Sequence, residues 1–352
     1  MILHRYLLRL LGTRVLAALV VLVSILQVLD LLDVTTDILE RKLGVEGVLY
    51  YATLRLPTLI QQVAPISVLA GCLFAFAQLA RENAVVALRS TGFSVYQLLA
   101  RMAPAMLVVV ALHLLCVQWA APRAEQALDA WWARSTPASE KEPPGPRSFR
   151  VGNDIVTAQM GGAAGARLTN VRIYRRDPQG KLIERLRAPE ATYVGDGWRL
   201  TSPMFETLGP SGVQRGAAQQ IVLRPGPRPA DIRAIFSRDA SVAPSAARRA
   251  LAGGAAVRPP SFYRTALQKG WAAPLSAFVM LLLTGPMLLV NFRSGGARTM
   301  VTCLGAGLTF LVIDGVFSAM GEAGTISPVL GAWAAPVMFA ALGATALLYQ
   351  EG

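Results

Sequence analysis

Residues 12–33 read GTRVLAALVVLVSILQVLDLLD, a long apolar run that ends in acidic residues. A helix rises about 1.5 Å per residue, so about 20 apolar residues can cross the ~30 Å hydrocarbon core of a membrane. Asp30 and Asp33 close the run and Asp37 follows, where a small-residue cleavage site would otherwise stand. The stretch therefore predicts a retained membrane-spanning helix and not a cleaved signal peptide.

Similar apolar blocks recur along the chain. Of its 352 residues, 53% are hydrophobic and only 16% are charged, well below the roughly 25% charge of soluble domains. The expected fold is an α-helical membrane protein with six transmembrane helices in a 3+3 arrangement around one long hydrophilic insert. The blocks predict spans at about 12–33, 56–80, 98–121, 271–292, 300–320 and 328–349.

The hydrophilic insert is expected to be an all-β domain of the sandwich or jellyroll kind. Its short runs alternate partly between apolar and polar residues, and Gly, Pro and Asp turn signals separate them. These runs are 149–160, 167–177, 182–194, 197–208 and 217–224. The predicted domains are residues 1–120 with three spans, 121–262 with the β-jellyroll, and 263–352 with three spans.

The charge distribution indicates a membrane protein and no nucleic-acid partner. Net charge is +13, and the insert holds 21 Lys and Arg against 12 Asp and Glu, a net of +9. Basic residues also gather before the first span and in the loops at 81–97 and 293–298. The positive-inside rule therefore places both termini and these loops in the cytoplasm and the insert outside. The basic insert would face either acidic membrane lipid or solvent.

Catalytic and metal-binding patterns are missing from the sequence. The two histidines lie far apart, the three cysteines fall inside apolar runs, and no Walker A loop occurs, so we expect no metal site and no ATP hydrolysis by this chain. His113 lies mid-span, where an interhelical hydrogen bond is the simpler role and a proton relay the alternative. Asp30, Asp33 and Asp314 are either interfacial anchors or a polar lining near a substrate entrance.

The loop ARENAVVALRSTGFSVYQ (80–97), between the second and third spans, predicts a short amphipathic helix. Its apolar face is formed by Ala84, Val85 and Leu88. Glu82 and Arg89 suit the two ends of the helix dipole, and Gly92 is a typical left-handed helix stop. The helix either lies on the membrane interface or docks as a coupling helix in the groove of a cytosolic motor protein.

Three passages together resemble the lipopolysaccharide export permeases, the LptF/LptG family. They are LARENAVVALRSTGFS (79–94), WAAPRAEQ (119–126) and FLVIDGVF (310–317). The first is similar to the family's coupling segment, with Gly92 and Phe93 in its closing turn. The second is similar to the family's Trp-x-x-Pro-x-x-Glu-Gln passage at the outer membrane surface, and the third to its Asp-containing helix end. The turn TGFS makes the chain resemble LptG more than LptF.

The resemblance implies a non-catalytic permease subunit of an ABC transporter in the bacterial inner membrane, with residues 121–262 in the periplasm. It implies three kinds of partner: an LptF-like permease, an LptB-like ATPase dimer that binds ATP and Mg, and LptC- and LptA-like jellyroll proteins. The chain itself would hold no cofactor and would pass lipopolysaccharide from the membrane to that periplasmic bridge. The implied ATPase-coupling residues are Glu82, Val85, Leu88, Arg89, Gly92 and Phe93.

Two positions depart from the family pattern. Ala84 stands where the family usually has an ATPase-contacting glutamate, so Glu82 is expected to serve instead. Asp30 stands where some members have a lysine in the first span, so other cations would meet the lipid phosphates. The candidate substrate-binding residues are Asp30, Asp33, Arg41, Lys42, Arg123, Arg134 and Asp314.

Two other functions fit the sequence. One is a membrane-anchored scaffold whose β domain binds an envelope protein and moves no lipid. The other is a secondary transporter that uses Asp314 and His113 for proton coupling. Co-purification with a cytosolic ATPase separates the transporter subunit from both alternatives.

Overall fold

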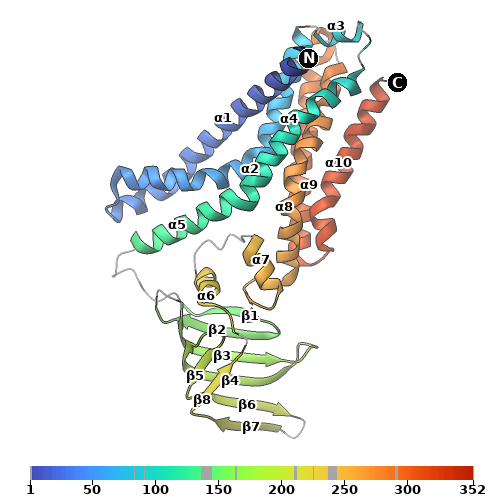
Figure 1. Cartoon of the computed structure of the whole chain (residues 1–352). Coiled ribbons are helices and arrows are strands. Elements are labelled where there is room, and N and C mark those ends of the chain that lie inside the picture. The colour runs from blue at the N-terminus through green and yellow to red at the C-terminus, as the bar shows by residue number, and fades with distance from the viewer. Residues whose placement is uncertain are drawn as a thin grey trace. The chain divides into compact units, whose positions relative to one another are not determined.

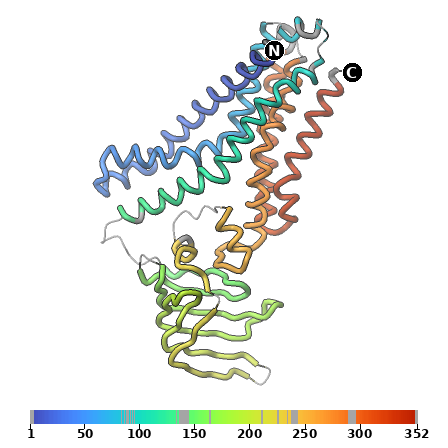
Figure 2. Tube along the Cα trace, viewed as in Figure 1, coloured from blue at the N-terminus to red at the C-terminus, as the bar shows by residue number. Residues whose placement is uncertain are grey.

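The computed structural model describes residues 2–82, 84–90, 92, 94–135, 145–162, 165–209, 212–224, 226–236, 244–289 and 292–351. The chain divides into two compact units, which Figures 1 and 2 show in ribbon and tube form. The helical unit is Met1–Trp131 with Thr265–Gly352, and the β unit is Trp132–Arg264.

Six helices of the described chain are long and apolar enough to cross a membrane, which confirms the predicted six-span helical fold. They are α1 (Ile2–Glu40), α2 (Gly44–Arg81), α4 (Val95–Leu115) with its continuation, α8 (Pro260–Thr284), α9 (Phe292–Ala323) and α10 (Pro328–Glu351). The 39 residues of α1 reach about 58 Å at 1.5 Å per residue, nearly twice the hydrocarbon thickness. Helix α1 therefore extends well past the apolar run 12–33 that predicted it.

Short elements complete the helical unit. The helix α3 (Ala84–Ser90) lies between α2 and α4, a π-helical turn η1 (Cys116–Ala120) leads from α4 into α5 (Ala121–Ser135), and a 3-10 turn η3 (Gly285–Leu289) follows α8. The path of α2 bends in Figure 1, and α2 contains Pro57 and Pro65. Proline removes a backbone hydrogen bond and kinks a helix.

The π-helical turn lies against the kinked part of α2. The Cys116 thiol donates a hydrogen bond to the Pro57 carbonyl at 3.1 Å. A π-helical turn interrupts the regular hydrogen-bond ladder of a helix, as a proline does. The two irregularities therefore lie side by side and allow both helices to change direction at the same level.

Close glycine contacts bring helices together at two places. A Cβ added at Gly71 of α2 would lie 2.5 Å from the Val15 Cα of α1. A Cβ added at Gly331 of α10 would lie 2.8 Å from the Gly321 Cα of α9. Small residues are enriched where membrane helices approach closely, because packing rather than hydrophobic burial drives their association.

The helices differ strongly in how much of their apolar surface the unit covers. In α2 and α8 the most apolar 18-residue stretch is 72% buried, whereas it is 11% buried in α1 and 17% in α9. Phe76 of α2 and Phe310 of α9 are among the largest fully buried side chains. The central helices are thus α2 and α8, and α1 and α9 are peripheral helices with open apolar faces.

The β unit is an antiparallel sheet, as predicted for the insert. Its strands are β1 (Arg147–Val151), β2 (Asp154–Met160), β3 (Arg167–Arg176), β4 (Leu182–Tyr193), β5 (Trp198–Thr201), β6 (Met204–Gly209), β7 (Gly212–Ala217), β8 (Gln220–Leu223) and β9 (Ala255–Ala256). The main order is β7-β6-β4-β3-β2-β1-β9. Two predicted runs split into strand pairs, one at Gly152 and one at Ser202, where φ is +60° and +47°.

The sheet forks at its longest strand. Residues 184–187 of β4 pair with β6, and residues 190–193 pair with β5, which in turn pairs with β8. A buried core lies between the main sheet and this branch, with Leu186 and Leu200 fully buried. A strand pair that branches and covers one face of a sheet gives the jellyroll-like form expected of the insert.

Two short helices follow the last long strand of the β unit. They are α6 (Pro229–Phe236) and α7 (Pro244–Leu251). From α6, Ile232, Ile235 and Phe236 are buried with the core of the sheet. An ion pair between Asp231 and Arg249 then joins α6 to α7.

Candidate functional site

The loop between α2 and α4 holds the residues predicted to couple the chain to an ATPase. The helix α3 covers Ala84–Ser90, and Gly92 follows in the left-handed region at φ +89°. Ser94 caps the next helix, because its hydroxyl accepts a hydrogen bond from the Gln97 amide at 3.2 Å. The side chains of Leu88 and Arg89, and the whole of Phe93, lie outside the described part of the chain.

Side-chain contacts fix the start of this loop to the helical unit. The Glu82 carboxylate accepts hydrogen bonds from Gln78 Nε2 at 2.8 Å and from the Tyr6 hydroxyl at 3.3 Å. Arg14 of α1 donates to Gln78 Oε1 at 2.7 Å. Val85 is only 5% exposed and packs in the helical core. Glu82 is thus an exposed carboxylate held in place, and Val85 anchors α3 rather than presenting itself at the surface.

A polar cluster joins α1, α2 and α5. Asp30 of α1 pairs with the Arg55 guanidinium of α2 at 3.1 Å and accepts a hydrogen bond from the Tyr51 hydroxyl at 2.9 Å. One turn along α2, the Thr58 hydroxyl donates to Glu125 of α5 at 3.1 Å. The cluster places the Arg55 cation of α2 directly beside Asp30.

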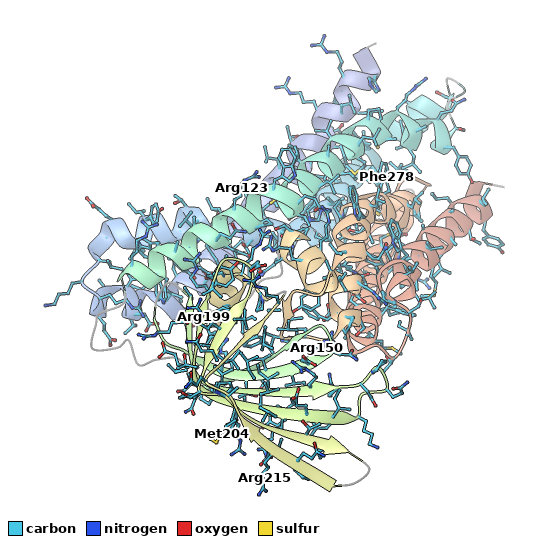
Figure 3. The ribbon with its side chains drawn as sticks, turned by 60° about the horizontal axis from the view of Figure 1, so that its bottom comes forward. Arg123, Arg150, Arg199, Met204, Arg215 and Phe278 are labelled. Atoms are coloured by element: carbon cyan, nitrogen blue, oxygen red, sulfur yellow. The ribbon has the colours of Figure 1, made fainter. Side chains whose placement is uncertain are left out.

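The other substrate-binding candidates near this cluster lie at the surface of the helical unit. Asp33 and Lys42 are exposed, and Arg41 is partly buried. Arg123 of α5 is exposed, with its guanidinium 5.5 Å from the centre of the Trp119 ring; Figure 3 labels it. Among the described residues, no hydrogen bond or ion pair joins Asp33, Lys42 or Arg123 to Asp30.

Arg134 belongs to the β unit and lies at the exposed end of α5. The structure therefore brings Asp30 together with Arg55, which the sequence analysis did not single out. Lys42, Arg123 and Arg134 are exposed cations and Arg41 is partly buried, and the substrate contacts of all four remain predictions.

A second ion pair joins the peripheral helix α9 to the central helix α8. Asp314 of α9 pairs with Lys269 of α8. Beside it, Trp333 Nε1 of α10 donates to Gln268 Oε1 of α8 at 3.1 Å. His113 is buried on α4, and within the described residues no hydrogen bond or ion pair joins it to Asp314. Asp314 is thus a paired carboxylate rather than an isolated one.

The β unit contains an apolar pocket of about 150 Å³. Its walls come from β1, β2 and β3 on one side and from β5 and β8 on the other, with Phe149, Ile173 and Leu200 among them. A dry cavity of this volume holds a molecule the size of benzene. The pocket is therefore lined for hydrocarbon but would have to widen to hold several acyl chains.

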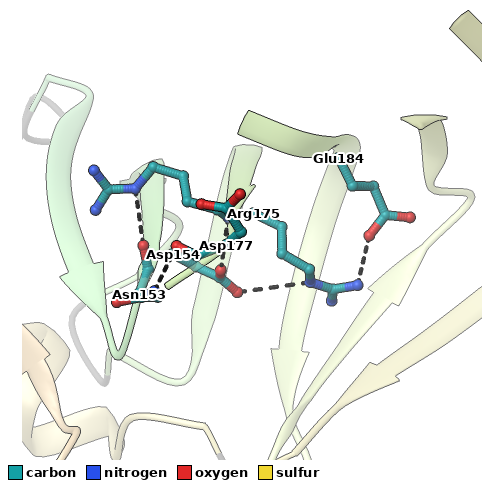
Figure 4. Close-up of polar contacts among 6 residues, drawn as sticks. Asn153, Asp154, Arg175, Asp177 and Glu184 are labelled. Atoms are coloured by element: carbon teal, nitrogen blue, oxygen red, sulfur yellow. Dashed lines mark hydrogen bonds and ion pairs between the residues drawn. The ribbon is translucent and has the colours of Figure 1, made fainter. Parts of the chain in front are cut away.

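One end of the pocket is polar. Arg175 lines it and bridges the carboxylates of Asp154 and Glu184, as Figure 4 shows. The neighbouring turns are tied together, because Asn153 Nδ2 donates to the Asp177 carbonyl at 2.8 Å. Within the described residues, no group of three His, Cys, Asp or Glu side chains could hold a metal ion.

The chain combines six candidate spans with an inserted, forked β-sheet, and one family model matches it. The model of the lipopolysaccharide export system permeases LptF/LptG matches residues 5–349. The chain belongs to the LptF/LptG family. No curated protein matches it in a direct sequence comparison. As a family member, the chain is a multi-pass permease subunit for lipopolysaccharide export and works with partner proteins.

Two residues of this LptF/LptG permease escaped the sequence analysis for the same reason. Arg55 lies one residue before the predicted span 56–80, and Lys269 lies two residues before the predicted span 271–292. Both residues were left out of the predicted spans, because a charged residue marks the end of an apolar run. The signal that could have found them is the unpaired carboxylate on a neighbouring span, which requires a cation at a similar level of the membrane.

Proposed function

We propose that this permease is a transmembrane subunit of an ABC transporter that draws lipopolysaccharide out of the inner membrane and delivers it to a periplasmic bridge. The family match over residues 5–349 carries the proposal. Both termini and α3 would be cytoplasmic and the β unit periplasmic, in agreement with the positive-inside rule. The turn TGFS favours an LptG-like member, paired with an LptF-like permease.

The anchoring of α3 supports its role as a coupling helix. A helix that transmits force from an ATPase needs a rigid connection to the spans, and Val85 provides one by packing in the helical core. Glu82 is held by two hydrogen bonds at the end of α2. An LptB-like ATPase dimer would bind ATP and Mg, and one copy would dock on the surface of α3.

The peripheral helices α1 and α9 support a lipid pathway along the helical unit. Their apolar faces are largely uncovered, and in a membrane such faces meet lipid, a second permease or the acyl chains of a substrate. Arg55, Arg41 and Lys42 gather cations near one end of α1, where they could meet lipid phosphates by charge-assisted hydrogen bonds. The widened pocket of the β unit would then receive acyl chains and pass them to LptC- and LptA-like jellyroll proteins.

The proton-coupled alternative has less support. A carboxylate that carries protons must change its charge during transport, and Asp314 is held in an ion pair with Lys269. The ion pair gives Asp314 a structural role, the joining of α9 to α8, that requires no proton transfer. We therefore prefer the ATP-driven function over proton coupling.

Charge reversal in the coupling helix tests the proposal. Arg89→Asp should abolish co-purification of the cytosolic ATPase and ATP-dependent release of lipopolysaccharide from proteoliposomes. Arg298→Asp is the matched control, since it reverses an exposed arginine on the same predicted side of the membrane. Retention of both activities by Arg89→Asp, or protease access to α3 from the periplasmic side, would overturn the assignment.

A further inference from the structure

The part of the β unit that leads back to α8 is strongly basic and exposed. Residues 226–236 and 244–264 contain six arginines and a single acidic residue, Asp231, a net of +5. All six arginines are exposed. We name this surface the basic belt, and it consists of Arg228, Arg233, Arg248, Arg249, Arg258 and Arg264.

The charges of the basic belt are poorly compensated within the protein. Arg249 pairs with Asp231 at 3.1 Å, and the Arg258 guanidinium lies over the Phe262 ring, 5.3 Å from its centre. The other members have no ion pair among the described residues. Five arginines of the sheet do have carboxylate partners: Arg167, Arg175, Arg185, Arg215 and Arg224. The basic belt thus offers cations to an anionic partner from outside the chain.

Chain connectivity places one end of the basic belt at the membrane surface. The span α8 begins at Pro260, so Arg258 and Arg264 flank its first turn. The Tyr263 hydroxyl accepts hydrogen bonds from the backbone amides of Val257 and Arg258, at 3.2 and 3.3 Å, which fixes the preceding loop to the helix. Tyrosine residues such as Tyr263 are enriched at the membrane interface.

The short helices keep the rest of the basic belt near that point. The ion pair between Asp231 and Arg249 joins α6 to α7, and both helices contact β9, which ends two residues before Arg258. The arginines of α6, α7 and the α8 start therefore lie on neighbouring elements of the β unit.

We propose that the basic belt binds the anionic headgroups of bilayer phospholipids and holds the β unit against the membrane. Charge complementarity selects this partner, because a membrane that contains phosphatidylglycerol is the anionic surface closest to the start of a span. Arginine suits the role, since its planar guanidinium binds phosphate oxygens through two parallel hydrogen bonds. The proposal does not depend on ATP-driven transport, and it gives the β unit a fixed attachment to the bilayer surface.

The test uses the full chain in lipid nanodiscs. All three cysteines are buried, so Ser245→Cys on the exposed surface of α7 accepts a fluorescent label selectively. Quenching by a headgroup spin-labelled lipid reports the distance of α7 from the bilayer. We expect quenching to rise with the phosphatidylglycerol fraction in phosphatidylcholine nanodiscs and to fall with added salt, as exposed charges are screened.

Two triple variants decide the outcome. The triple variant Arg248→Gln, Arg258→Gln and Arg264→Gln should weaken the phosphatidylglycerol response about a hundredfold. Each basic residue near an anionic surface strengthens binding about fivefold, and three such factors multiply. The matched control replaces three exposed sheet arginines that lack an ion pair among the described residues, Arg172, Arg187 and Arg199. The control should keep the response.

Three results would overturn the proposal. The first is quenching that does not depend on phosphatidylglycerol. The second is an equal loss in both triple variants, which would indicate a general effect of net charge. The third is a response to lipopolysaccharide alone in phosphatidylcholine nanodiscs, which would identify the partner as a substrate phosphate. Unchanged thermal melting of both triple variants excludes misfolding as the cause, and transport remains a separate measurement.

Discussion

Neutralising either partner of the Asp30–Arg55 pair should lower the free energy of unfolding of the helical unit. Neutralising both partners should lower it by less than the sum of the two single losses. Arg55→Met removes the cation beside the partly buried Asp30 carboxylate, and Asp30→Asn removes the negative charge that pairs with Arg55. Removing one partner of a buried pair costs about 3–5 kcal/mol in soluble proteins. We expect about 3 kcal/mol for Arg55→Met and about 2 kcal/mol for Asp30→Asn, because both groups keep some solvent.

The structure sets the size of the coupling between the two residues. The Asp30 side chain is 17% exposed and the Arg55 side chain is 26% exposed, and the closest atoms of the pair are 3.1 Å apart. Two unit charges about 4 Å apart attract by about 4 kcal/mol at an effective dielectric constant of about 20. Loss of hydration opposes most of this attraction, and interhelical polar contacts in membranes reach at most about 1.7 kcal/mol. The added bond from Tyr51 places the expected coupling near that limit, about 1.5 kcal/mol.

A double-mutant cycle measures this coupling. The free energy of unfolding of the parent, both single variants and the double variant is obtained by titrating SDS into mixed detergent micelles. Asp196 and Arg224 provide the matched control, since they form an Arg–Asp pair at 3.0 Å with side chains 68% and 61% exposed. An exposed pair should couple by less than about 0.5 kcal/mol.

Additive single effects for Asp30 and Arg55 would refute this reasoning. So would a coupling no larger than that of the exposed control, because burial would then add nothing. A charge exchange, Asp30→Arg with Arg55→Asp, gives an independent check. It should recover part of the stability lost in either single variant if attraction across the two helices is the cause.

Further predictions concern helix packing and the loop at α3. Gly71→Ala would place a methyl group 2.5 Å from the backbone of α1 and should lower the melting temperature by several degrees, whereas Gly305→Ala, with open space around it, should not. Lys269→Met should destabilise the unit by about 3 kcal/mol in a micelle titration, and combining it with Asp314→Asn should cost about 1.5 kcal/mol less than the sum of the two single losses. Gly92→Ala meets no atom but forces alanine to φ +89°, so it should cost about 1 kcal/mol locally and reduce ATPase binding in a pull-down while leaving the melting temperature unchanged.

The spans could be predicted from sequence because long apolar runs have few alternatives in a membrane. The ends of the helices could not be predicted, because an apolar run stops at the first charged residue whereas a helix can continue past it. Arg55 and Lys269 continue α2 and α8 beyond the predicted spans, and each does so with a carboxylate partner on another helix. That partner lies on a different element, so a local pattern cannot reveal it.

The strands show the same limit in another form. Alternation predicted most strand positions, and the splits at Gly152 and Ser202 each need a residue in the left-handed region. A serine does not signal a turn as a glycine does, so the sequence did not reveal the split at Ser202. The fork at β4 depends on one strand pairing with both β5 and β6, and the sequence of a strand does not specify which neighbours it takes. The inward direction of Val85 is likewise set by the helices around α3.

The two ion pairs have a common arrangement. On each peripheral helix, one carboxylate is held by a cation of a central helix: Asp30 of α1 by Arg55, and Asp314 of α9 by Lys269. An ion pair at one level of a helix opposes its rotation, because turning would leave a charge alone in hydrocarbon. The open apolar faces of α1 and α9 are therefore kept toward the surroundings of the unit.

Close packing restrains each peripheral helix a second time. For α1 the packing partner and the ion-pair partner are the same helix, and for α9 they are different helices. Val15 of α1 packs closely on α2 at Gly71, so packing and the ion pair bind α1 to the same helix. Gly321 of α9 packs on α10, whereas the ion pair of α9 reaches α8. Backbone contacts tolerate little sliding, but a lysine on a flexible four-carbon stem can follow a shift. If α9 moves in the membrane, it should therefore move together with α10 and relative to α8, while α1 stays with α2.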